Sequence, residues 1–136
     1  MTQIDFYILS NRSRMQFICQ LAEKIFGLGH RIFIHTESEQ DARALDDLMW
    51  VFRDRSFLPH GRAGKDPEAA IQIGSGDEPA GEFQVLVNLA AQVPSFFSRF
   101  DRVAEVVDKD EQVRTHGRER FRFYKDRGYP LETHTL

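Results

Sequence analysis

The side chains with the clearest capacity for chemistry lie near the end of the chain, in the stretch VRTHGRERFRFYKDRG (113–128). Six of the chain's 18 basic residues fall there against two of its 21 acidic residues, although the formal net charge of the whole chain is −3. Guanidinium groups hold carboxylates and phosphates through paired hydrogen bonds, and the same stretch carries two phenylalanines and a tyrosine. The composition raises the question of why an acidic chain gathers a third of its bases around three aromatic residues.

The bases of this stretch fall on one side of the helix that they are predicted to form. With residues placed about 100° apart around a helix, four bases come within an arc of about 80°: Arg114, Arg118, Arg122 and Lys125. An adjoining apolar stripe, which should pack on the sheet, comprises Val113, Gly117, Phe121 and Tyr124. Arg120 and Arg127 lie beyond that stripe, outside the basic group.

Three interpretations of this basic surface follow from the residues alone. The first is a solvated amphipathic helix whose arginines stay in water. The second is a nucleic-acid site, in which arginines contact phosphates and aromatic rings stack on bases. The third is a site for a short acidic peptide or a chain terminus, whose carboxylate is held by arginine while an apolar side chain fills a pocket beside Phe121. Because the chain outside 113–128 is acidic, most of its surface would repel a long polyanion, and we favour the peptide.

Motifs that carry catalysis, metals or nucleotides are not found in the sequence. The five histidines are scattered without metal-ligand spacing. The stretch GRAGKD (61–66) resembles the end of a phosphate loop, but its spacing is wrong and Asp66 replaces the magnesium-binding hydroxyl. No glycine-rich dinucleotide motif follows the first predicted strand, where the residues are SNRSRM. We therefore expect no catalytic residue, no metal and no cofactor, and keep a degenerate nucleotide-binding enzyme that uses residues 60–66 as a rival.

The hydrophobic pattern predicts that an α/β scaffold positions these residues. β-prone runs predict strands near 4–9, 31–35, 70–74, 84–89 and 103–107. Apolar residues at spacings of three and four predict helices over 15–26, around 42–49 and over about 110–127, and a short helix is predicted over 94–100. This alternation predicts a largely parallel sheet flanked by helices, in one domain over residues 1–136. Residues 51–69 are predicted to form a structured loop.

Polar residues that can cap helices mark where the helices should begin and end. In chain order the candidates are Ser10 or Asn11, Thr36 with Glu39 or Ser38 with Asp41, Asp108 or Asp110, and finally Gly128 as a C-cap.

The size and composition fit an ordinary globular protein. With 136 residues, 41% of them hydrophobic and 29% charged, the chain is long enough to bury a core. The single cysteine, Cys19, excludes an internal disulfide and lies in an apolar run, which favours a packed thiol. The N-terminus has no signal-peptide pattern, and no apolar stretch approaches the roughly 20 residues of a membrane span. We expect a cytoplasmic protein.

Three segments together resemble a known family. They are DFYIL at the start, DDLMWVFRDRSFLPHG in the middle and GRERFRFYKDRGY at the end, and in this order and spacing they are similar to the chi subunit of the bacterial DNA polymerase III holoenzyme. The resemblance implies a single Rossmann-like α/β domain without catalytic activity, joined to the clamp-loader assembly through a small partner called psi. It also implies binding to the C-terminal tip of single-stranded DNA-binding protein, an acidic peptide that ends in Pro-Phe, so that any contact with DNA is mainly indirect.

The same resemblance implies roles for individual residues. Arg118 matches the family's arginine for the terminal carboxylate of the tip, and Arg114 and Arg122 match basic residues that can meet its aspartates. Phe121 and Val107 match apolar pocket positions, with Phe121 replacing a tyrosine that relatives can carry. A second family segment, and so a candidate surface for another partner, comprises Trp50, Phe57, Pro59 and His60. The alternative is that Trp50 and Phe57 anchor the loop 51–69 onto the core.

Overall fold

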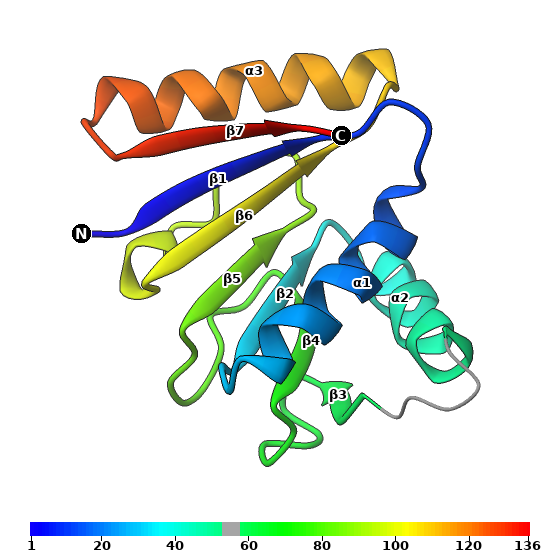
Figure 1. Cartoon of the computed structure of the whole chain (residues 1–136). Coiled ribbons are helices and arrows are strands. Elements are labelled where there is room, and N and C mark those ends of the chain that lie inside the picture. Colours follow the sequence, from blue (N-terminus) through cyan, green and yellow to red (C-terminus); the bar gives the residue numbers. More distant parts are fainter. Residues whose placement is uncertain (53–57) are drawn as a thin grey trace.

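Within the described residues, the central β-sheet is entirely parallel. A computed structural model describes residues 1–52 and 58–136, and within them seven strands form one sheet in the order β3-β4-β2-β5-β6-β1-β7 (Figure 1). Every pairing recorded between neighbouring strands is parallel. The strands are β1 Gln3–Ile8, β2 Ile32–Thr36, β3 His60–Arg62, β4 Ile71–Ser75, β5 Val85–Asn88, β6 Arg102–Val107 and β7 Leu131–Thr135. The predicted α/β class with a largely parallel sheet is confirmed.

The five predicted strands correspond to β1, β2, β4, β5 and β6, whereas two strands were not predicted. β3 lies inside the predicted loop 51–69, so that prediction is wrong at residues 60–62. β7 has the sequence Leu-Glu-Thr-His-Thr, and its glutamate and both threonines are exposed. Within the described residues both are edge strands, which need no continuous apolar run because one side has no neighbouring strand.

Three helices follow the predicted pattern, with one change at a cap. They are α1 Arg14–Gly27, α2 Glu39–Val51 and α3 Glu111–Asp126. Ser38 and Asp110 cap α2 and α3 through backbone N–H groups at 3.1 and 3.0 Å, and Gly128 follows α3 with φ of 77°. Ser13 caps α1, so the prediction of Ser10 or Asn11 is wrong by two or three residues. The predicted short helix over 94–100 is a single 3₁₀ turn, Phe97–Arg99. Among the described helices, none has both the length and the apolar character needed to cross a bilayer.

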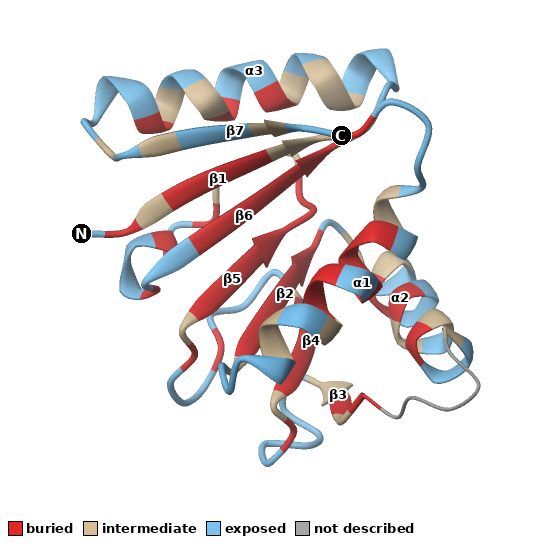
Figure 2. Ribbon diagram, viewed as in Figure 1, coloured by how far each residue is buried: buried red, intermediate tan, exposed pale blue. Residues whose placement is uncertain are grey.

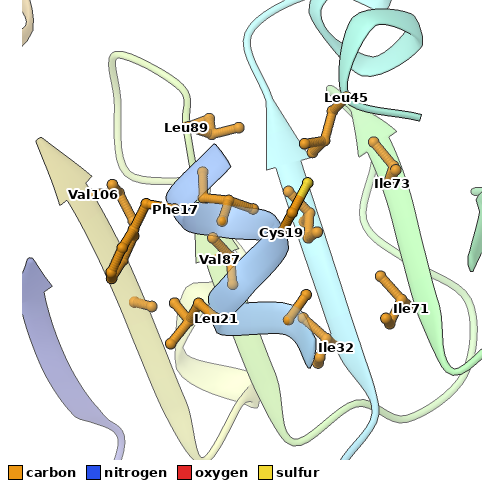
Figure 3. Packing of buried hydrophobic residues seen from close by; sticks show 14 of the residues in the cluster. Phe17, Cys19, Leu21, Ile32, Leu45, Ile71, Ile73, Val87, Leu89 and Val106 are labelled. Carbon is orange, nitrogen blue, oxygen red and sulfur yellow. The ribbon is translucent and has the colours of Figure 1, made fainter. Parts of the chain in front are cut away.

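The helices cover opposite faces of the sheet. α1 and α2 pack on one face, and α3 packs on the other, over the β6-β1-β7 side (Figure 1). Side chains alternate between the two faces along each strand: Ile32 and Ile34 join the α1 side, while Phe33 joins the α3 side. Figure 3 shows the α1 side, where Cys19 is buried among aliphatic residues, and this burial raises the pKa of its thiol to about 11. The predicted packed thiol is confirmed.

Candidate functional site

Helix α3 lies close against β6 because of a glycine on its buried side. Gly117 and Tyr124 are buried, and Val113 and Phe121 are partly buried against the core cluster that contains Tyr124, so the predicted apolar stripe is confirmed. Figure 2 shows that buried and exposed residues alternate along α3 as its turns face the sheet or solvent. A Cβ atom at Gly117 would lie 2.9 Å from Cγ2 of Val107, which is closer than real Cβ contacts. A side chain at this position would therefore have to push α3 or Val107 aside.

A cavity of about 310 Å³ opens between α3 and the strands beneath it. Its lining is mostly apolar, with two guanidinium groups at the helix side, and comprises Phe6, Ile8, Val107, Arg114, Gly117, Arg118, Phe121 and Thr133. Four of the five predicted peptide-binding residues thus lie around one cavity. Phe6, Ile8 and Thr133 were missed, because they belong to β1 and β7 and carry no charge that would single them out in the sequence.

A second hollow continues along the same helix. It measures about 470 Å³ and shares Arg118 and Phe121 with the first cavity, while its other lining residues are Arg122, Lys125 and Asp126. Arg122, the fifth predicted residue, therefore lies beside the second hollow and does not line the first. Arg118 and Phe121 form the boundary between an apolar cavity and a more open basic one.

Among the described residues, no acidic side chain forms an ion pair with the arginines at the two hollows. Arg114 donates from Nε to the Asp108 carbonyl oxygen at 3.0 Å, and Arg118 donates from Nη2 to the Thr115 hydroxyl at 3.3 Å. Within residues 1–52 and 58–136, no carboxylate lies within 4.0 Å of Arg114, Arg118 or Arg122 in the recorded ion pairs. Their positive charge is therefore available to an external anion.

Arg120 has the opposite environment, and its partner was missed. The Arg120 side chain is 4% exposed and donates from Nε to Oε1 of Glu105 at 2.8 Å. Glu105 is fully buried and also accepts from the Tyr124 hydroxyl at 2.7 Å and from Asn88 Nδ2 at 3.1 Å. Burial raises the pKa of Glu105, while the charge of Arg120 acts in the other direction. The sequence signal was a single acid within the apolar strand VAEVV.

The candidate second surface is partly exposed and partly structural. Trp50 is 57% exposed, and its ring lies 4.7 Å from that of the buried His60. His60 Nδ1 lies 2.6 Å from the Leu58 carbonyl oxygen, and Nε2 lies 3.1 Å from Asp46 Oδ1 without the alignment of a hydrogen bond. The partly buried Pro59 accepts the backbone N–H of Ile71, whereas Phe57 lies outside the described residues. Pro59 and His60 are thus tied to the fold, and Trp50 is presented to solvent.

The loop that resembles a phosphate site has a different shape from one. Residues 60–62 form β3, and the chain then turns back, with Lys65 and Asp66 N–H groups donating to the Arg62 carbonyl oxygen at 3.0 and 3.3 Å. A phosphate loop instead runs from a strand into the N-terminus of a helix, where free N–H groups bind the phosphates. This geometry argues against the rival nucleotide-binding enzyme.

In the described part of the chain, one group of three side chains has metal-ligand chemistry. Asp5, Glu132 and His134 present ligand atoms within 4.8 Å of one another. Asp5 already pairs with Arg102 at 3.0 Å and with His134 at 3.2 Å, and the His134 ring stacks on Tyr7. These contacts join β1 to β6 and β7 without requiring an ion.

Comparison with known proteins places the chain in a family. The family model described as "DNA polymerase III chi subunit, HolC" matches residues 1–132. The chain belongs to the chi subunit family. Among curated relatives, the DNA polymerase III subunit chi of Pseudomonas aeruginosa is 38% identical over 139 residues, covering 100% of this chain and 98% of that protein. The Escherichia coli chi subunit is 28% identical over 145 residues, covering 99% of both chains.

Family membership makes this chi chain a replication accessory subunit of DNA polymerase III. Solved structures add information on the fold alone. T4 UvsW matches with a TM-score of 0.71 at 12% identity, over 99% of this chain and 41% of that one. The C-terminal domain of the DEAD-box protein Dbp5 matches with a TM-score of 0.62 at 13% identity, over 98% of this chain and 89% of that domain.

Proposed function

We propose that this chi chain binds the acidic C-terminal tip of single-stranded DNA-binding protein and links that protein to the replicase. The observation that carries the proposal is the apolar cavity of about 310 Å³ beneath α3, bordered by Arg114 and Arg118. A terminal phenylalanine needs an apolar cavity, and its adjacent carboxylate needs a cation at the rim. The cavity offers both within one site, because Arg118 and Phe121 belong to the same turn of helix.

Each residue has a distinct part in this proposal. Arg118 takes the terminal carboxylate, while Phe121 and Val107 form walls of the cavity for the phenylalanine ring. Arg114 beside the cavity and Arg122 at the second hollow supply positive potential for the aspartates that precede the terminal phenylalanine of the peptide. A carboxylate held by a guanidinium fork has directional as well as electrostatic preference, so the site favours a chain end over an internal acidic stretch.

The second part of the proposal concerns assembly. The chain acts without catalytic activity, in the cytoplasm, as a single domain attached to the clamp loader through a psi subunit where the organism has one. Trp50 and the residues near it are a candidate surface for a further partner, and no psi contact is assigned to a named residue. With DNA bound by the single-stranded DNA-binding protein, this chain contacts DNA mainly indirectly.

Calorimetry with the tip peptide tests the proposed site. Hydrogen bonds to a charged group contribute about 1.5–3 kcal/mol, so Arg118→Ala should weaken the peptide about 10- to 150-fold and leave the fold intact. Arg118→Lys should recover part of the loss, because an ammonium cannot form the fork. Arg127→Ala is the matched control, because Arg127 lines neither hollow. Arg127 instead lies over the Phe123 ring at 3.6 Å and donates to the Phe123 carbonyl oxygen. Equal affinities of Arg118→Ala and Arg127→Ala would contradict the assignment.

The alternative is direct binding of single-stranded nucleic acid, favoured by the row of bases along α3. A titration of labelled single-stranded DNA, with and without the single-stranded DNA-binding protein, separates the two functions. Direct binding that weakens steeply with salt supports the nucleic-acid site. Recruitment that requires the partner protein, and that is lost in Arg118→Ala, supports the peptide site.

A further inference from the structure

We propose that Glu105 is a positioning residue for the peptide site and sets the rotation of α3 about its own axis. The proposal rests on the proposed function and adds a determinant that lines neither of the two hollows. It begins from β6, which meets α3 at two places. Val107 and Glu105 are two residues apart on this strand, so both side chains point to the α3 face of the sheet.

The two contacts constrain different properties of the helix. At Val107 the contact is steric, because a Cβ atom at position 117 would clash with the Val107 side chain. This contact sets how near α3 can lie to the strand. At Glu105 the contact is directional, because the carboxylate accepts from Arg120 Nε and from the Tyr124 hydroxyl. Arg120 and Tyr124 are one helical turn apart, so together they hold one side of α3 toward the strand.

The anchor lies on a different part of the helix surface from Arg118. Arg118 precedes Arg120 by two residues, so their side chains lie about 160° apart around the helix, and Phe121 lies between them. If α3 rotates about its axis as a unit, a movement of Arg120 relative to Glu105 also moves the Arg118 guanidinium and the Phe121 ring relative to the cavity. The rotation that gives Arg120 its bond to Glu105 is the one that brings Arg118 and Phe121 to the cavity rim.

The anchor extends beyond α3 and β6. Arg120 Nη1 donates to the Ala91 carbonyl oxygen at 3.0 Å, and Asn88 at the end of β5 donates to both oxygens of Glu105. The Asn88 side-chain oxygen in turn accepts the Ala90 N–H at 3.1 Å. Glu105 therefore ties α3 to two neighbouring strands and to the segment after β5, and a neutral side chain at this position would leave a buried guanidinium without its counter-charge.

A thermodynamic cycle on peptide affinity tests the positioning role. Glu105→Gln keeps the shape of the side chain and removes its charge. Coupled residues show interaction energies that correspond to about 2- to 150-fold in affinity, so we expect Glu105→Gln to weaken the tip peptide about fivefold in the otherwise wild-type protein. In the Arg118→Ala background the same substitution should weaken the peptide clearly less than in the wild-type background, because one of the two residues that it positions is already gone.

A general loss of stability must be distinguished from positioning. Leu45→Ala removes a fully buried side chain on the other face of the sheet, and it should lower stability while leaving peptide affinity unchanged. Tyr124→Phe deletes one bond to Glu105 and keeps the ring, so it serves the same cycle, with a smaller expected effect, if Glu105→Gln does not fold. Tyr124→Phe should then weaken the peptide in the wild-type background more than in the Arg118→Ala background.

The outcomes are separable. If the wild-type protein does not bind the peptide, the proposed function fails and this inference fails with it. If the wild-type protein binds and depends on Arg118, but folded Glu105→Gln binds equally well, the positioning role alone is overturned. The same conclusion follows if Glu105→Gln weakens binding equally in both backgrounds, or if Leu45→Ala weakens it as much.

Discussion

Arg118 and Arg120 lie two residues apart on α3, yet the helix gives them opposite environments. Arg120 faces the sheet, is 4% exposed and pairs with a fully buried carboxylate. Arg118 is exposed, borders two hollows and donates to the Thr115 hydroxyl. The comparison teaches that residue type alone does not show whether an arginine of this helix stabilises the fold or is free to bind a partner. The orientation of the side chain relative to the sheet decides this, because it determines whether the guanidinium is already paired with a buried carboxylate.

The largest effect on stability is expected on the buried side of α3. Arg120→Met keeps an aliphatic stem but leaves Glu105 without its counter-charge, and breaking a buried pair costs about 3–5 kcal/mol of unfolding free energy. Arg118→Met, the matched exposed change, should stay within about 0.5 kcal/mol of wild type. Urea unfolding of both variants measures the difference. If the two variants had similar unfolding free energies, the Arg120–Glu105 pair would not stabilise the protein more than the exposed Arg118 does.

A smaller effect is expected where α3 meets Val107. Gly117→Ala gains up to about 1 kcal/mol of helix propensity but places a Cβ atom 2.9 Å from the stiff Val107 side chain. Overpacking costs about 1–3 kcal/mol, so we expect a net loss near 1 kcal/mol together with weaker peptide binding. In a Val107→Ala background the same change should instead stabilise the protein. A stabilising Gly117→Ala in the wild-type background contradicts the close packing.

The smallest effect is expected at Arg127, on neither the buried nor the peptide side. Arg127→Ala removes a cation–π contact with Phe123, which is worth about 0.5–1 kcal/mol at an exposed site. Peptide affinity should be unchanged, and thermal unfolding should shift by a few degrees at most. A large drop in affinity would extend the recognition surface beyond the face that contains Arg118.

Much of this scaffold is predictable from local patterns. Strong β-prone runs and periodic apolar residues locate five strands and three helices, and Ser38 with Asp41 marks the start of α2. The start of α1 was misplaced because several polar residues precede it and any of them can cap a helix. β3 and β7 were missed because a strand of three residues and a polar edge strand leave little signal in the sequence.

The candidate site, like the scaffold, was predictable from the sequence only in part. The spacing of Arg114, Arg118 and Arg122 within one helix predicts a shared face, because helix geometry alone fixes it. The cavity floor and the Glu105 anchor could not be predicted, since Phe6, Thr133 and Glu105 reach α3 through pairings between strands that are distant in the sequence. Glu105, the acid within VAEVV, is buried where Arg120, Tyr124 and Asn88 all donate to its carboxylate.

Backbone amide shifts, followed by NMR while the tip peptide is titrated into the labelled protein, test the central claim most directly. The account predicts that the shifts cluster at the cavity: at Val107, along α3 from Arg114 to Arg122, and at Thr133 on β7. A peptide that lacks its terminal phenylalanine should leave Val107 and Thr133 nearly unperturbed. Shifts that gather around Trp50 and His60 instead, or that are the same with and without the terminal phenylalanine, would contradict the claim that the cavity under α3 receives the end of an acidic chain.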